Sequence, residues 1–324
     1  MTPKKIAIIG CGRVGTSLAV FLSKAGYNVA GVASKTISSA QKTVQAILSI
    51  KGEGRNNSKE ETINSQEKTN NSKDITSYED VKLCISPAEA AISGDIIFIT
   101  TPDNLIQNVC FEISSNPLVD ISEKTIFHCS GALSSCVLAS ASDKGANTGS
   151  IHPLQSFAPY TLGQNSPFVG INVSVEGNEK ALVIGKELIS SLNANYFTIP
   201  TKSKTLYHAA AVVASNYLVT LENCALNLLK EANLSEDKAY TILEPLIQGT
   251  LNNIKTRGTI AALTGPVARG DFAIVEKHLK DIDEVLPNFS KLYRVMGDYT
   301  LKLAQKRGDL EQGSIDRLSE VFNK

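Results

Sequence analysis

The chain has 324 residues and a mass of 34.7 kDa, which suits two domains better than one. Apolar residues make up 42% and charged residues 20%, which excludes global disorder. Lys and Arg together number 32, as do Asp and Glu, and this balance argues against a nucleic-acid-binding protein. No stretch reaches the roughly 18 consecutive apolar residues of a membrane span, so we expect no membrane partner.

Cysteine and histidine usage indicates neither disulfides nor a metal. The six cysteines are scattered and form no C-x-x-C pair, which favours free thiols in a reducing cytoplasm. The four histidines show no spacing typical of metal ligands. We therefore expect a cytoplasmic protein without a metal site.

The first part of the chain alternates short apolar runs with helix-period segments. Strands are predicted at 5–9, 28–33, 95–100 and 125–128, and the first helix at 13–25. Continuous apolar strands separated by helices predict an α/β fold, a doubly wound Rossmann-type parallel sheet. The polar segment 51–74 has a single large apolar residue, Ile63, and is interpreted as a flexible insertion.

The second part predicts an all-helical C-terminal domain. After further strands within 168–175 and 194–200, and a helix over 181–192, only helical periodicity remains. Helices are predicted at 206–231, 235–255, 271–286 and 287–307, with glycine and proline at their boundaries. The predicted division is a dinucleotide-binding domain over 1–200 and a substrate and dimerisation domain over 201–324.

A glycine-rich turn joins the first strand to the first helix. It reads Gly10-Cys11-Gly12-Arg13-Val14-Gly15, the G-x-G-x-x-G pattern in its required context. Gly10 permits the tight turn, Gly12 lets the backbone approach a diphosphate, and Gly15 permits close helix–strand packing. The N–H groups of the helix N-terminus then face the anion, so the turn predicts a bound dinucleotide.

The end of the second strand indicates which dinucleotide. An NAD-preferring site usually has Asp or Glu here, about 20 residues after the glycines. This chain has Ser34 and Lys35 instead, with Arg13 in the turn as a second cation. A hydroxyl and an ammonium suit a 2′-phosphate, so we predict NADP(H) as the cofactor.

Polar residues follow the later parallel strands, where ligands bind in such sheets. Thr100, Thr101 and Pro102 follow one strand, and Ser130 and Gly131 follow the next. All five are predicted to line the cofactor crevice. His128 is either a buried strand residue or part of the site, and His152, which is extended before Pro153, faces the cleft in one interpretation.

The segment 205–221 is rich in alanine and valine and predicts a buried, closely packed helix. His208 and Asn216 interrupt it, and each buried polar group requires a partner. That partner is either a substrate or the neighbouring backbone. In the glycine-punctuated connection 261–271, Arg269 is a candidate to bind a substrate carboxylate, and Asp271 is predicted to cap the following helix.

Four motifs together resemble one family. They are GCGRVG at the start, HPLQSF at 152–157, YHAAAVVASNYL at 207–218 and LTGPVARGD at 263–271. The chain resembles the Rossmann-like plus domain-of-unknown-function oxidoreductases of the 6-phosphogluconate-dehydrogenase-like superfamily, some of which are considered ketopantoate reductases. In the better-known ketopantoate reductases, a lysine and an asparagine occupy the places of His208 and Asn216. The resemblance therefore implies catalytic roles for these two residues, with Lys204 as an alternative source of the charge.

The function implied is an NADPH-dependent reductase of a small, carboxylate-bearing carbonyl substrate, first a 2-oxo acid such as ketopantoate. Hydride transfer to C=O would be accompanied by a proton from His208, while Asn216 holds the substrate and Arg269 pairs with its carboxylate. Three alternatives stay open: an imine reductase of the pyrroline-5-carboxylate type, a deazaflavin-dependent NADP oxidoreductase, and a non-enzymatic NADPH-binding regulator. A homodimer through the helical domain is expected, because exposed apolar helix faces need cover.

Overall fold

The computed structural model describes residues 4–56 and 81–323. It divides into two compact units, Met1–Val212 and Val213–Lys324, which are treated separately below. The predicted domain boundary at residue 200 stays a prediction.

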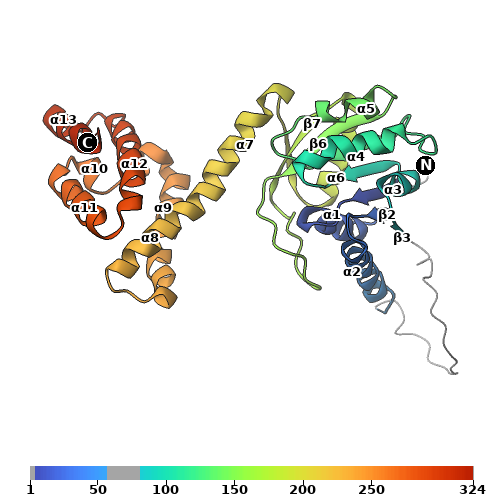
Figure 1. Cartoon of the computed structure of the whole chain (residues 1–324), viewed down its shortest axis with the longest axis horizontal. Coiled ribbons are helices and arrows are strands. Elements are labelled where there is room, and N and C mark those ends of the chain that lie inside the picture. Colours follow the sequence, from blue (N-terminus) through green and yellow to red (C-terminus); the bar gives the residue numbers. More distant parts are fainter. Residues whose placement is uncertain (1–3, 57–80, 324) are drawn as a thin grey trace. The chain divides into compact units, whose positions relative to one another are not determined.

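The first unit is built on a single eight-stranded sheet (Figure 1). Its order is β3-β2-β1-β4-β5-β6-β7-β8, and every neighbouring pair is parallel except β6 and β7. The strands are β1 Lys5–Ile9, β2 Asn28–Ala33, β3 Lys82–Cys84, β4 Ile96–Ile99, β5 Thr125–His128, β6 Asn147–Pro153, β7 Asn172–Gly177 and β8 Asn195–Thr198. The predicted doubly wound α/β fold is confirmed.

Helices cover both faces of this sheet because successive strand residues point to opposite sides. In β1, Ile6 and Ile8 join one buried cluster, whereas Ala7 and Ile9 join the other. The first cluster takes up α1 (Arg13–Lys24), α2 (Ile37–Asn56) and α6 (Glu179–Ser191). The second takes up α3 (Pro87–Ser93), α4 (Asp103–Ser115), η1 (Ser135–Leu138) and α5 (Ala139–Ser142).

The predicted insertion at 51–74 starts inside a helix, because α2 continues to Asn56. Residues 57–74 lie outside the described residues. The first unit ends with η2 (Thr201–Ser203) and α7 (Lys204–Val212).

The second unit is all-helical, as predicted. It contains the π-helical turn η3 and six α-helices: η3 Val213–Tyr217, α8 Leu218–Glu231, α9 Glu236–Ala262, α10 Pro266–Arg269, α11 Phe272–Val285, α12 Pro287–Gln305 and α13 Gln312–Asn323. Its buried core comes from α11, α12 and α13. Asp271 caps α11 by accepting a hydrogen bond from the Ile274 N–H at 3.3 Å, which confirms its predicted role.

The prediction of a buried helix over 205–221 was wrong. Lys204 is the only buried residue of α7, and α8 has none. The π-helical turn at Val213–Tyr217 also interrupts the single helix expected at 206–231.

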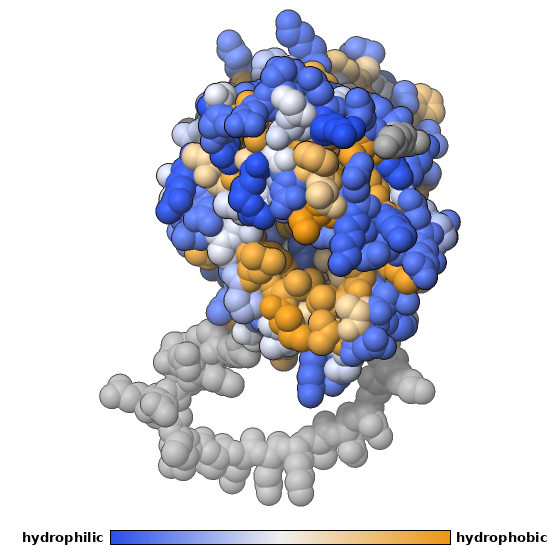
Figure 2. All heavy atoms as spheres, turned by 90° about the vertical axis from the view of Figure 1, so that its left-hand side faces the viewer, coloured by the Kyte–Doolittle hydropathy of each residue, from blue (hydrophilic) through white to orange (hydrophobic). Residues whose placement is uncertain are grey.

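Apolar side chains are also exposed on the surface. Figure 2 shows several of them gathered on the face that it turns toward the viewer. By length and composition alone, the helical stretch Thr201–Glu231 passes the test for a membrane-spanning helix, and so do core helices of soluble proteins.

Candidate active site

The glycine-rich turn packs directly against the carboxyl end of β4. Gly10 has a positive φ of 107°, and its N–H donates to the Ala33 carbonyl at 2.8 Å. A Cβ at this position would lie 2.8 Å from backbone atoms of Thr100 and Thr101. Only glycine therefore fits here, and the turn is fixed between β2 and β4.

Two further glycines shape the start of α1 differently. A Cβ on Gly15 would lie 1.9 Å from the Gly10 carbonyl oxygen, so Gly15 permits close packing of the helix on the turn. A Cβ on Gly12 would meet nothing within 4 Å, so the space beside Gly12 is open. Gly12 is also the N-cap and provides no side-chain hydrogen bond to the first turn of α1. Open space next to such N–H groups fits a diphosphate.

The threonines after β4 have separate roles. Thr100 Oγ1 donates to the Gly10 carbonyl at 2.6 Å and thereby holds the turn in place. Thr101 Oγ1 is buried and has no hydrogen-bond partner among the described residues. Pro102 is the N-cap of α4. A buried hydroxyl without a protein partner suits a ligand, so Thr101 is the better candidate for cofactor contact.

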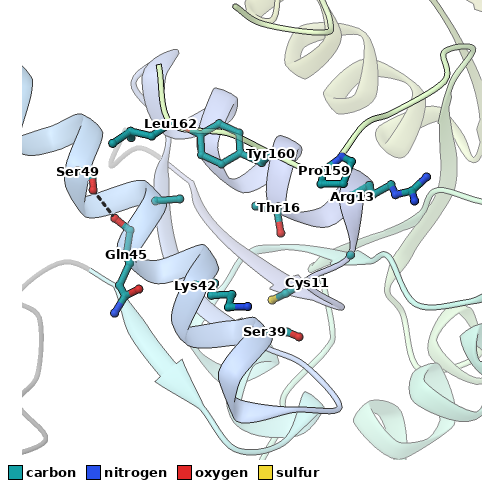
Figure 3. A pocket seen from close by; sticks show the side chains of 12 residues that line it. Cys11, Arg13, Thr16, Ser39, Lys42, Gln45, Ser49, Pro159, Tyr160 and Leu162 are labelled. Atoms are coloured by element: carbon teal, nitrogen blue, oxygen red, sulfur yellow. Dashed lines mark hydrogen bonds between the residues drawn. The ribbon is translucent and has the colours of Figure 1, made fainter. Parts of the chain in front are cut away.

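A cavity of about 550 Å³ extends from the turn along α1 and α2 (Figure 3). One wall is formed by Lys42, Ser39 and other residues of α2, and another by the segment after β6, including Tyr160. Arg13 also lines this cavity. Its twelve described lining residues include two cations and no Asp or Glu, which suits an anionic ligand.

The end of β2 is held against the glycine-rich turn. Ser34 Oγ accepts a hydrogen bond from the Cys11 N–H at 3.3 Å, which ties the end of β2 to the turn. Lys35 follows Ser34 and is exposed, and it is not among the described residues that line the cavity. Sequence reasoning identified Arg13 and Lys35 but missed Lys42, since a lysine on a helix is usually just a solvated residue.

Replacing Lys42 with alanine is expected to weaken NADPH binding by about 10-fold and NADH binding little, because a charge-assisted hydrogen bond to a phosphate contributes about 1.5–3 kcal/mol. Lys35→Ala should behave similarly. The measurement is a fluorescence titration of each variant with both nucleotides. The control is Lys180→Ala, which removes an exposed lysine of α6 that forms an ion pair with Glu123. It should change neither affinity. An equal loss for NADH and NADPH would contradict a role at the 2′-phosphate.

The turn after β5 is organised by one serine. Ser130 is buried, and its hydroxyl donates to Asp103 Oδ2 at 2.7 Å. Ser130 Oγ also accepts hydrogen bonds from the N–H groups of Ala132 and Leu133, at 3.1 and 3.0 Å. Ser130 therefore shapes the turn that contains Gly131, and its hydroxyl is already used within the protein.

His128 is a buried strand residue, one of the two roles considered for it. Its Nδ1 accepts a hydrogen bond from the Ser130 N–H at 3.1 Å, and its Nε2 lies 3.1 Å from the Ser134 carbonyl. Burial, with a smaller effect from Lys204, lowers the pKa of His128 to about 4. A neutral ring with both nitrogens engaged fits a structural role.

Three aromatic side chains meet at the carboxyl ends of β5 and β6. His152, at the end of β6, lies with its Nδ1 2.8 Å from the Tyr207 hydroxyl on α7. The ring centroids of His152 and His208 are 6.2 Å apart. Both imidazoles lie over Gly131, since a Cβ there would be 2.6 Å from His208 Cδ2 and 2.8 Å from His152 Nε2. The predicted residues Gly131 and His208 thus lie together.

A buried lysine lies beneath this group. Lys204 is 2% exposed, and its Nζ donates to the Ser130 carbonyl at 2.8 Å and to Ser150 Oγ at 2.6 Å. Burial lowers the pKa of Lys204 to about 8. Lys204 points into the protein, which favours an electrostatic and positioning role over direct proton donation to a substrate.

A buried carboxylate anchors the start of the helix that contains Lys204. Glu176 on β7 accepts hydrogen bonds from the Ser135 N–H and, at 2.9 Å, from the Ser135 hydroxyl. Its second partner is Thr201 Oγ1 at 3.1 Å, in η2 just before α7. The negative charge of Glu176 is the main factor that opposes the fall in the pKa of Lys204. This network fixes the position from which α7 begins.

The other two predicted catalytic residues belong to the second unit. Asn216 is exposed in the π-helical turn, and Arg269 is exposed at the end of α10. Their roles toward a substrate stay predictions.

The side chain of Val14 packs against the core of the first unit, and its predicted contact with the cofactor stays a prediction. Among the described residues, no group of three or more His, Cys, Asp or Glu side chains is arranged to hold a metal ion.

Two family models match separate parts of the chain. Residues 5–123 match the family model described as NADP oxidoreductase coenzyme F420-dependent. Residues 171–300 match a domain of unknown function, DUF2520. The first match agrees with the predicted NADP(H) cofactor and with an oxidoreductase. No curated protein matches the sequence.

Solved structures share the fold at low sequence identity. A candidate NADP oxidoreductase from Bacteroides fragilis is 20% identical, with a TM-score of 0.69 over 93% of this chain and 98% of that one. An imine reductase from Myxococcus stipitatus in complex with NADP⁺ is 14% identical, with a TM-score of 0.57 over 99% and 100%. A pyrroline carboxylate reductase from Plasmodium falciparum with NADP bound is 12% identical, with a TM-score of 0.53 over 99% of both chains. These matches support the Rossmann-type architecture followed by an all-helical region.

Proposed function

We propose that this protein is an NADPH-dependent reductase of a small substrate with a C=N or C=O bond, and that a cyclic imine bearing a carboxylate is its first candidate substrate. The observation that carries the proposal is the group formed by His152, Tyr207 and His208 over Gly131. It lies at the carboxyl ends of β5 and β6, the edge of a doubly wound sheet at which ligands bind.

Different residues of the first unit would bind the nucleotide, orient the substrate and donate the proton. When bound, NADPH supplies a hydride. The backbone at Gly12 and the hydroxyl of Thr101 bind the nucleotide, and Lys42 and Lys35 select its 2′-phosphate. The rings over Gly131 orient the substrate and provide the proton that its nitrogen or oxygen must gain. His208 remains a candidate donor, as the sequence suggested.

Imines come before 2-oxo acids because the fold is shared with an imine reductase and a pyrroline carboxylate reductase. The resemblance to ketopantoate reductases keeps 2-oxo acids as the second class. In either class Arg269 would pair with the substrate carboxylate. The Lys204 ammonium hydrogen-bonds to a carbonyl and a hydroxyl beneath the site, and this cation favours an anionic substrate.

The test is an NADPH-oxidation screen with purified protein against carboxylated cyclic imines and 2-oxo acids in parallel. Turnover with imines and not with oxo acids is the expected result. The reverse would assign a C=O reductase of the ketopantoate type. A deazaflavin absorbance spectrum in the purified protein, with NADPH oxidised only when that coenzyme is present, would assign the deazaflavin-dependent class. NADPH binding without any turnover would favour a regulator and overturn the proposal.

We also propose that the protein is a homodimer through its helical unit, located in the cytoplasm. Within 241–254 the helix α9 has one charged residue, Glu244, while Ile242 and Leu246 are 50% and 67% exposed. A helix that is apolar on several sides is normally enclosed. A second copy of the same helices provides matching apolar surface without charges to bury. The six free cysteines suit a reducing compartment.

Replacing Leu246 with glutamate is expected to convert the dimer to a monomer, since it places a charge in the centre of the apolar interface. The measurement is molar mass by light scattering after size-exclusion chromatography. Leu118→Glu, at an equally apolar residue that is 77% exposed on the first unit, is the control and should leave the dimer intact. A monomeric wild-type chain, or one that sediments with lipid vesicles, would contradict the proposed interface.

A further inference from the structure

One hydrogen bond links two motifs that lie far apart in the sequence. His152 lies near the end of β6. Tyr207 lies in the first turn of α7, 55 residues later in the sequence. The distance from His152 Nδ1 to the Tyr207 hydroxyl is 2.8 Å. Both side chains are half-buried, so they are positioned by the protein and still reachable by a small ligand.

Neighbouring rings hold this pair in one orientation. The Tyr207 ring packs edge-on against His152 at 5.6 Å between centroids and against Phe197 of β8 at 5.8 Å. On the other side, the His152 ring lies over Gly131 and beside His208. The pair is therefore fixed next to the turn after β5, where sheets of this type bind their ligands.

The surroundings keep both rings uncharged near neutral pH. Burial first, then the charges of Lys204 and His208, lower the pKa of His152 to about 4, with Asp103 opposing. Burial raises the pKa of Tyr207. Tyr207 thus retains its proton, and neutral His152 can donate only one N–H.

We propose that Tyr207 is the proton donor of the reductase and that His152 is its positioning residue. In this arrangement Nδ1–H of His152 and the hydroxyl of Ser174 both donate to the Tyr207 oxygen, and the Tyr207 O–H donates to the substrate. The proposal rests on the proposed function, and it assigns His208 to the wall of the site instead of the proton transfer.

The balance of the step is simple. NADPH, when bound, would supply a hydride to the carbon of the C=N or C=O bond and be oxidised to NADP⁺, and the π electron pair would move to the nitrogen or oxygen. That atom takes the proton from Tyr207 as the phenolic O–H bond breaks. The resulting tyrosinate is stabilised by the N–H of His152. A proton from water restores the phenol.

The test replaces the hydroxyl alone. Tyr207→Phe is expected to lower kcat by about 10²–10⁴-fold, the usual contribution of a general acid, without changing the Kd for NADPH measured by fluorescence. Tyr196→Phe, on an exposed strand residue, is the matched control and should keep full kcat. His208→Ala should lower kcat less than Tyr207→Phe. A fully active Tyr207→Phe enzyme overturns the proposal.

Two further readouts separate positioning from simple damage. His152→Ala should lower kcat by about 10-fold, while His152→Asn, whose amide can donate in place of Nδ1, should recover part of that loss. Nitrogen-15 NMR of histidine-labelled wild-type protein reports the tautomer directly and requires no turnover. It should show the hydrogen on Nδ1 of His152. A hydrogen on Nε2 would overturn the arrangement even if the substrate screen finds no activity.

Discussion

Replacing Gly12 with alanine is expected to abolish useful NADPH binding while leaving the fold intact. A Cβ at this position meets no protein atom within 4 Å, so the free energy of unfolding should change by no more than about 0.5 kcal/mol. The methyl group would occupy the open space beside the first turn of α1, where the diphosphate accepts backbone hydrogen bonds. Loss of two such charge-assisted bonds corresponds to at least about 100-fold in Kd.

Gly15→Ala is the informative comparison. Its Cβ would lie 1.9 Å from the Gly10 carbonyl oxygen and 2.4 Å from Thr100 Oγ1, so α1 must move away from the turn. We expect both a Kd increase and a loss of about 3 kcal/mol of stability. Gly313→Ala, in α13 with nothing within 4 Å of its Cβ, is the control for both measurements. Titration calorimetry and urea unfolding would be run on all three variants. A Gly12→Ala protein that binds NADPH normally would exclude the turn as the diphosphate site.

The turn and the sheet were predictable because their signals are local. The strand at 125–128 is a run of buried residues, and the strand 5–9 leads directly into glycines whose spacing has one structural meaning. The sequence also placed Gly131 and His208 in the site. The strands and glycine-rich turn depended on a residue and its immediate neighbours, whereas the role of His208 was implied by the resemblance to ketopantoate reductases.

The pairing of His152 with Tyr207 was not predictable in this way. It depends on β6 and α7 meeting across 55 residues, and nothing in either motif specifies its partner. Lys204 was considered only as a source of charge for the substrate, because its burial against Ser130 and Ser150 depends on tertiary packing. The exposed helix faces were misjudged for a related reason. Composition shows that α8 is apolar, but not whether its own chain or a second copy covers it.

Replacing Lys204 with methionine is expected to lower kcat by about 10–100-fold while the protein still folds. Methionine fills a similar volume, but it removes the hydrogen bonds from Nζ to the Ser130 carbonyl and Ser150 Oγ that hold the turn beneath His152 and His208. The same substitution should raise the pKa of His152, because the charge of Lys204 is the second-largest cause of its depression. Turnover and histidine NMR titrations of the two proteins are the measurements. An unchanged His152 pKa would show that Lys204 does not act on the site through its charge.

The difference in the free energy of unfolding between the wild type and Lys204→Met should also change with pH. The pKa of Lys204 falls from 10.5 to about 8 on folding, so between these values the unfolded chain binds more protons than the folded one. The free energy of unfolding of the wild type, relative to Lys204→Met, should therefore rise by about 3 kcal/mol as the pH increases from about 8 to about 10.5. Below pH 8 the lysine is charged in both states, and the full cost of burying that charge remains. Urea unfolding at the two ends of this range measures the difference, and other titrating groups cancel because both proteins share them. A constant difference across the range would mean that Lys204 is not a buried ammonium in the folded protein.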